Sequence, residues 1–133
     1  MTDGPGVYLA KAQESLASAQ SEFANGRFNT CANRCYYACF QAAIAALLAA
    51  GIRSTRTTER WKHEYVQSEF VRILINSKKL YEPSLRDTLA RLQTLRQVAD
   101  YEPDSVTRTE ASRALRRAGQ FVEAVTSQLG DTL

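Results

Sequence analysis

The residues best suited to chemistry lie at the end of one leucine-lined segment, LRQVADYEP. Arg96 and Asp100 are four residues apart, so on a helix they lie on one face and can form an ion pair. Tyr101 follows directly. An exposed ion pair by itself contributes little to stability. A cation, a carboxylate and a phenol at one helix end are nevertheless the main candidate polar site of this chain.

A further candidate is His63, the only histidine. Imidazole changes charge near neutral pH and is therefore a suitable proton carrier. A single histidine does not support a Ser-His-Asp arrangement, and the sequence has neither a glycine-rich phosphate loop nor a paired-carboxylate motif. His63 and Arg96 belong to different predicted helices, so only the fold decides whether they meet. The alternative for His63 is a packed or surface position without a function.

Three cysteines, Cys31, Cys35 and Cys39, recur every four residues and therefore face one side of a helix. Thiolates in this arrangement can share a metal ion, but small thiols also pack well in a hydrophobic core. Parallel side chains on one helical face are poorly placed for a disulfide. Zinc would also need a fourth ligand. We predict that the cysteines are core residues, and we predict no metal and no cofactor.

Helices must position these candidates, and the central one is the stretch from Phe28 to Ala50. From Cys35 onward its only polar side chain is Gln41. A helix that is apolar on every side has to be covered on every side, which predicts the middle helix of a bundle. The apolar run is about 24 Å long, too short to span a hydrocarbon core of roughly 30 Å.

The other helices are predicted from apolar residues at helical spacing. Gly4-Pro5-Gly6 is interpreted as a leader before the first helix, and Thr107 with Glu110 has capping-box spacing for the last. The charges of the fourth helix, Arg96 among them, are expected to face outward or toward a partner. The prediction is a single all-α domain over 1–133, an up-and-down bundle of about five helices with its core at about 7–129. The four outer helices are expected at about 7–24, 61–75, 83–101 and 107–129.

Charge and termini place weaker limits on function. The net charge of +3 permits RNA or another acidic partner but does not argue for one. The most basic stretch, 53–60, is predicted to be a solvated loop, with a contact to phosphate as the alternative. The N-terminus lacks the features of a signal peptide. We therefore predict a cytoplasmic protein without a membrane partner.

Two segments resemble the HEPN family, the "higher eukaryotes and prokaryotes nucleotide-binding" domains. The pattern N-R-x-Y-Y-A-x-F, followed by an alanine-rich apolar run, begins here at Asn33 and ends at Phe40. The later ending R-x-x-A-D-Y begins at Arg96 and ends at Tyr101. The resemblance covers about Tyr8 to Val125, nearly the whole chain.

This resemblance implies a helical bundle that commonly dimerises. Many HEPN proteins are metal-independent endoribonucleases, often toxins paired with a separately encoded nucleotidyltransferase antitoxin. Their signature is an arginine followed, after four to six residues, by a histidine. These types suit RNA cleavage, which needs proton transfer and a cation beside the phosphate. Here Arg96 is present, but Tyr101, Glu102 and Pro103 stand where the histidine is expected.

Two hypotheses about function follow from this departure. In the first, the protein is a dimeric module, in a toxin–antitoxin or defence context, that binds RNA, a nucleotide or a nucleotidyltransferase, with doubtful nuclease activity. In the second, it is a metal-independent endoribonuclease toxin that uses Arg96 with Asp100, Tyr101 or His63. The residues expected to line the cleft beside these are Asn33, Arg34 and Tyr37.

A purely structural interpretation is also open. In it, Arg34 and Asp100 form a buried ion pair, and Tyr101 caps the interior of the bundle. Buried charges persist only when they are paired, so this role is compatible with a functional one.

Overall fold

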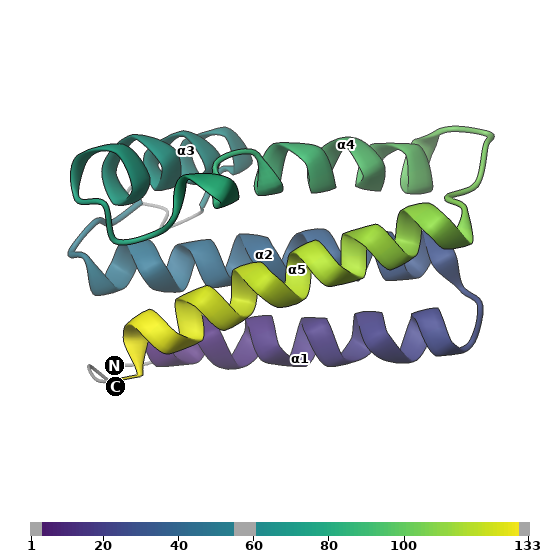
Figure 1. Cartoon of the computed structure of the whole chain (residues 1–133), viewed down its shortest axis with the longest axis horizontal. Coiled ribbons are helices and arrows are strands. Elements are labelled where there is room, and N and C mark those ends of the chain that lie inside the picture. The colour runs from purple at the N-terminus through teal and green to yellow at the C-terminus, as the bar shows by residue number, and fades with distance from the viewer. Residues whose placement is uncertain (1–3, 55–60, 131–133) are drawn as a thin grey trace.

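Helix α2 (Phe28–Ala49) lies in the middle of the bundle and is covered by the others (Figure 1). Our computed structural model describes residues 4–54 and 61–130. Most of the basic loop predicted at 53–60 lies outside these residues. The other α-helices of the described residues are α1 (Pro5–Ala24), α3 (His63–Glu69), α4 (Thr88–Tyr101) and α5 (Arg108–Leu129).

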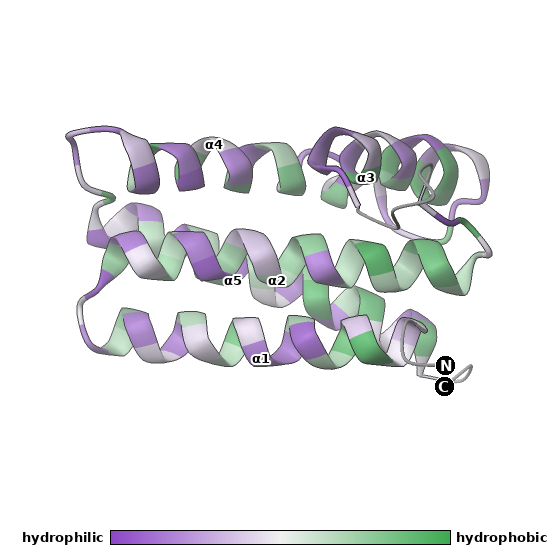
Figure 2. Cartoon of the chain, turned by 180° about the vertical axis from the view of Figure 1, so that it is seen from behind, coloured by the Kyte–Doolittle hydropathy of each residue, from purple (hydrophilic) through white to green (hydrophobic). Residues whose placement is uncertain are grey.

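The burial of α2 confirms the prediction of a central helix. Figure 2 shows that its C-terminal half is mostly hydrophobic. The three cysteines are completely buried, and Cys39 lies in surroundings that raise the pKa of its thiol through loss of hydration. Their prediction as core residues is therefore confirmed. Among residues 4–54 and 61–130, no group of three or more His, Cys, Asp or Glu side chains could hold a metal ion.

The first and last helices cover two sides of α2. Helix α1 begins at Pro5, so the predicted loose leader is wrong for Pro5 and Gly6. Proline suits the first helical position because its φ is already helical and its missing N–H would have no partner there. At α5, the predicted capping box is confirmed: the Thr107 side chain accepts from the Glu110 backbone N–H, and the Glu110 side chain accepts from the Thr107 N–H.

Helices α3 and α4 lie on the side of α2 opposite α1 (Figure 1). Helix α3 continues as a π-helix, η1 (Phe70–Ser77), two residues beyond the predicted end. The fourth helix was predicted to begin at Pro83, but Pro83–Leu85 forms only a 3-10 turn, η2, and α4 starts at Thr88. No helix of the described residues is both long enough and apolar enough to cross a membrane.

Candidate functional site

Tyr36 brings the two best chemical candidates together. Its ring is completely buried in α2. The His63 ring, from α3, stacks on it with the ring centroids 5.4 Å apart. The guanidinium carbon of Arg96, from α4, lies 5.3 Å from the centroid of the same ring. Three helices therefore meet at Tyr36, and the fold places His63 and Arg96 on one aromatic side chain.

His63 is held as a neutral base. Its ring also stacks on Phe40, with centroids 4.5 Å apart, and its Nδ1 is hydrogen-bonded to the Tyr36 hydroxyl at 2.5 Å. Burial, together with the positive charge of Arg96, lowers the pKa of His63 below its usual 6.5. The imidazole is therefore uncharged at neutral pH, the form that can accept a proton.

The hydroxyl of Tyr36 orients this imidazole. Gln67 Nε2 donates to the Tyr36 oxygen at 3.3 Å, which leaves the Tyr36 O–H to donate to Nδ1 of His63. Burial raises the pKa of Tyr36 to about 12, so its proton is retained. Gln67 Nε2 also donates to Gln93 Oε1 on α4. When Nδ1 accepts from the Tyr36 hydroxyl, the single ring proton of the neutral imidazole is on Nε2.

Arg96 lies inside the bundle, so the expectation that it faces outward or toward a partner is wrong. The residue is 9% exposed. Its Nη1 donates to Asp100 Oδ2 at 3.0 Å, and its guanidinium lies over the rings of Tyr36 and Tyr37. Burial lowers the pKa of Arg96, but Tyr37, Tyr101 and Asp100 raise it by more. These contacts partly offset the buried charge, while the buried Nε of Arg96 has no hydrogen-bond partner among the described residues.

Asn33 separates the two residues that the structural interpretation paired. Its Nδ2 donates to Asp100 Oδ2 at 3.2 Å, while its Oδ1 accepts from Arg34 Nε at 3.0 Å and Nη2 at 2.8 Å. The buried Arg34–Asp100 pair of the structural interpretation is therefore wrong, because Asp100 pairs with Arg96. The Arg34 guanidinium instead lies over the Tyr37 ring, 5.3 Å from its centroid.

Tyr101 does not cap the interior of the bundle, as one interpretation expected. It is the last residue of α4 and is 74% exposed. It borders an open depression of about 520 Å³ between the N-terminal part of α2 and the end of α4. We call this depression the polar hollow; its lining residues are Asn29, Thr30, Asn33, Ala99, Asp100 and Tyr101.

Asn29 and Thr30 were not among the residues selected from the sequence. Both are polar residues of the first turn of α2, at i−4 and i−3 from Asn33. That spacing places Asn29 and Thr30 on the same helix face as Asn33. The spacing is the one feature of the sequence that indicates that they belong to the same site. Asn29 also connects to the segment just before α5, since its Oδ1 accepts from the backbone N–H of Val106 at 2.8 Å.

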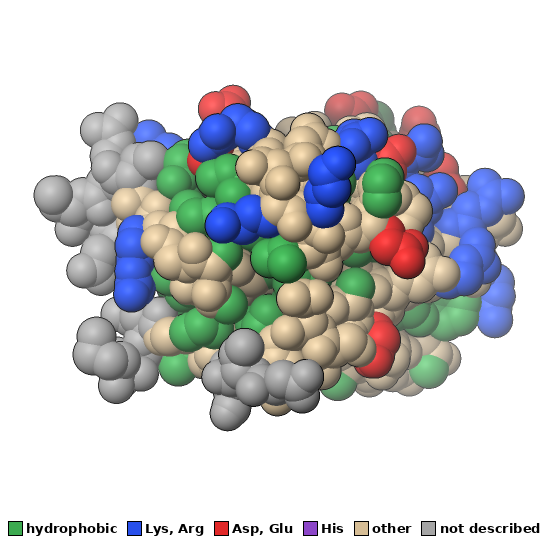
Figure 3. All heavy atoms as spheres, turned by 60° about the vertical axis from the view of Figure 1, so that its left-hand side comes forward, with side chains coloured by type: hydrophobic (Ala, Val, Ile, Leu, Met, Phe, Trp, Pro, Cys, Tyr) green, Lys and Arg blue, Asp and Glu red, His purple; other side chains and the backbone are tan. Residues whose placement is uncertain are grey.

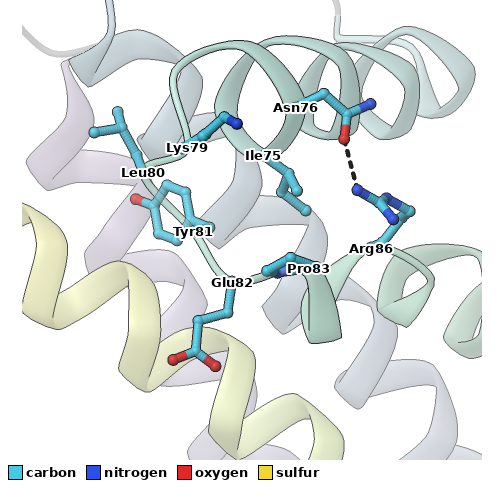
Figure 4. Close-up of a pocket in the computed structure, with 8 residues that line it drawn as sticks. All are labelled: Ile75, Asn76, Lys79, Leu80, Tyr81, Glu82, Pro83 and Arg86. Carbon is cyan, nitrogen blue, oxygen red and sulfur yellow. Dashed lines mark hydrogen bonds between the residues drawn. The ribbon is translucent and has the colours of Figure 1, made fainter.

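A second depression lies under the connection between η1 and α4 (Figure 4). Arg86 Nη2 donates there to Asn76 Oδ1 at 2.7 Å. Figure 3 shows that end of the bundle, where Lys and Arg side chains are scattered among hydrophobic and uncharged ones. No residue selected from the sequence lines this depression, so it is separate from the candidate site.

The comparison with protein families agrees with the all-α fold. A model of the HEPN domain matches residues 6–128. The chain belongs to the HEPN domain family. The predicted all-α HEPN bundle is thereby confirmed, and membership supports a module whose role concerns nucleotides or RNA. No curated protein gave a significant match.

Within this HEPN domain, the sequence-selected residues form one connected set. A chain of contacts runs from Arg34 through Asn33, Asp100 and Arg96 to the two tyrosines and His63. Tyr101 is attached to the outer end of this set, beside the polar hollow. The set thus has an enclosed half around Tyr36 and an open half around Asp100 and Tyr101.

Proposed function

We propose that this HEPN domain binds a nucleotide or single-stranded RNA in the polar hollow and does not cleave it. The observation that carries the proposal is the exposed Tyr101 ring beside hydrogen-bonding side chains. Unpaired bases stack on aromatic rings and are recognised along their edges by hydrogen bonds. The hollow offers Tyr101 for stacking, and Asn29, Thr30 and Asp100 for hydrogen bonds.

The charges near the hollow support binding more than catalysis. Arg34 forms no ion pair with residues 4–54 or 61–130, so its charge is available to a phosphate. Arg96, by contrast, is buried and paired with Asp100. A phosphate would have to displace this carboxylate to reach the Arg96 guanidinium.

A homodimer and a separately encoded nucleotidyltransferase partner are part of the proposal. HEPN domains often dimerise, and the resemblance to toxin–antitoxin members favours such a partner. These two elements rest on the family and not on a contact of this chain.

A second candidate function is metal-independent RNA cleavage. The observation in its favour is the meeting of His63 and Arg96 on Tyr36. A neutral imidazole can accept the proton of the RNA 2′-hydroxyl. A guanidinium beside it can stabilise the negative charge that develops on the phosphate. His63, however, is half-buried under Phe40 and Tyr36, which argues against direct access of RNA.

Replacing Tyr101 with alanine tests the binding proposal. Base–aromatic stacking contributes about 1–3 kcal/mol per base, so affinity for single-stranded RNA should fall about fivefold or more. The melting temperature should change little, because the ring is exposed. Fluorescence anisotropy with labelled RNA measures the affinity.

The matched control is Leu80→Ala. Leu80 is the other large hydrophobic residue exposed among the described residues, at 40%, and it borders the depression of Figure 4 instead. This variant should bind RNA as the wild type does. Equal affinities of the Tyr101→Ala and Leu80→Ala proteins would contradict the proposal.

A further inference from the structure

One carboxylate oxygen in the polar hollow has no hydrogen-bond partner among residues 4–54 and 61–130. Asp100 accepts two hydrogen bonds from described residues, from Arg96 and from Asn33, and both end on Oδ2. These bonds fix the carboxylate in place. Its Oδ1 therefore remains as a positioned acceptor in a site that Asp100 helps to line.

We propose that the polar hollow selects guanine, an inference that rests on the proposed function and names its ligand. A carboxylate oxygen only accepts hydrogen bonds, so it favours a base edge that only donates. Guanine has two adjacent donors, N1–H and the N2 amino group, and both can converge on one oxygen. The guanine edge thus matches Asp100 Oδ1.

The other bases place an acceptor next to their donor. In adenine, N1 lies beside the N6 amino group, and in cytosine N3 lies beside the N4 amino group. Uracil has carbonyl oxygens on both sides of N3–H. Each would bring a lone pair toward the negatively charged Asp100, which costs free energy in a partly desolvated site.

The other groups that line the hollow, together with Arg34 next to its lining residue Asn33, are compatible with a guanine nucleotide. Tyr101 provides the stacking surface at the rim. Asn29 uses its Oδ1 for Val106, so its amide N–H groups are left to donate to guanine O6 or to the ribose. Arg34, held by Asn33, supplies the cation for a phosphate.

Titration calorimetry with mononucleotides tests this selectivity. GMP should bind at least about fivefold more tightly than AMP, CMP or UMP, the smallest discrimination expected of a two-bond contact to a base. IMP keeps N1–H but lacks the N2 amino group and should lie between GMP and AMP. The RNA pentamers UUGUU and UUAUU provide the same comparison within a strand.

The comparison of GMP with the RNA pentamers distinguishes a free nucleotide from single-stranded RNA as the ligand. A guanine preference with both GMP and UUGUU supports a nucleotide site, and a preference seen only with UUGUU supports a site for RNA. Equal affinity for all bases would overturn the guanine inference while leaving RNA binding intact. Failure of every nucleotide and RNA to bind would overturn the proposed function as well.

Asp100→Asn provides the matched substitution. An amide presents a donor as well as an acceptor, so this variant should lose the preference for guanine over adenine. The control is Asp104→Asn, which removes the same charge from an exposed residue that does not line the hollow and should keep the preference. Retained preference in Asp100→Asn would contradict the inference. If circular dichroism shows that Asp100→Asn is unfolded, the comparison of GMP with IMP on the wild type decides.

Discussion

Tyr36→Ala is expected to lower the free energy of unfolding by about 3–5 kcal/mol, the usual cost of removing a buried aromatic side chain. The Tyr36 ring is completely buried and contacts side chains from α2, α3 and α4. Its loss would leave a cavity in α2 and remove the surfaces on which His63 and Arg96 lie. Urea unfolding followed by circular dichroism measures the change.

Tyr36→Phe is the matched control, because it keeps the ring and removes only the hydroxyl. His63 and Gln67 would each lose a hydrogen-bond partner, at a cost of about 1–3 kcal/mol. The alanine variant should therefore be clearly less stable than the phenylalanine variant. Equal stabilities of the two would show that the ring does not join the three helices.

Asp100→Ala is expected to destabilise the protein by about 2–3 kcal/mol. Removing one partner of a buried ion pair costs about 3–5 kcal/mol when both groups are enclosed. The Arg96 side chain is enclosed, but that of Asp100 is 27% exposed, so water can partly replace the lost carboxylate. The substitution would also release Asn33 Nδ2.

Asp104→Ala serves as the comparison for Asp100→Ala. Asp104 is an exposed carboxylate just beyond α4, and its replacement should change stability by no more than about 0.5 kcal/mol. If Asp100→Ala lowers the free energy of unfolding by as little as Asp104→Ala does, the ion pair with Asp100 does not stabilise the buried charge of Arg96.

The helices were predictable from the sequence because their signals are local. The apolar run of α2 requires cover whatever its neighbours are, and the capping box at Thr107 and Glu110 involves only one turn. The start of α4 was predicted too early, because Pro83 favours a helical first turn in both a 3-10 turn and an α-helix.

The polar contacts could not be predicted because they depend on which helices pack together. Helical spacing alone suggested that Arg96 is a surface charge. It is buried because Tyr36 and Tyr37, from another helix, lie beneath its guanidinium. The meeting of His63 with Arg96 likewise requires α3 and α4 to share one side of α2.

Within the candidate site, the contact along one helix was predictable and the contacts between helices were not. Arg96 and Asp100 pair as their i, i+4 spacing indicates. Asn33 lies between Asp100 and Arg34 and is hydrogen-bonded to both. The structural interpretation paired Asp100 with Arg34 by charge alone and therefore missed this asparagine. The exposure of Tyr101 also differs from the structural interpretation: it is the last residue of α4, and its ring borders the polar hollow and does not enter the core.

We propose above that this HEPN domain binds RNA and does not cleave it. In the most direct test, the wild-type protein is incubated with end-labelled single-stranded RNA in excess EDTA. Binding is then measured on a native gel, and the length of the RNA on a denaturing gel. We predict that the RNA is bound and remains full length. Cleavage in EDTA that a folded His63→Ala variant lacks would contradict the account and assign catalysis to the enclosed half of the site.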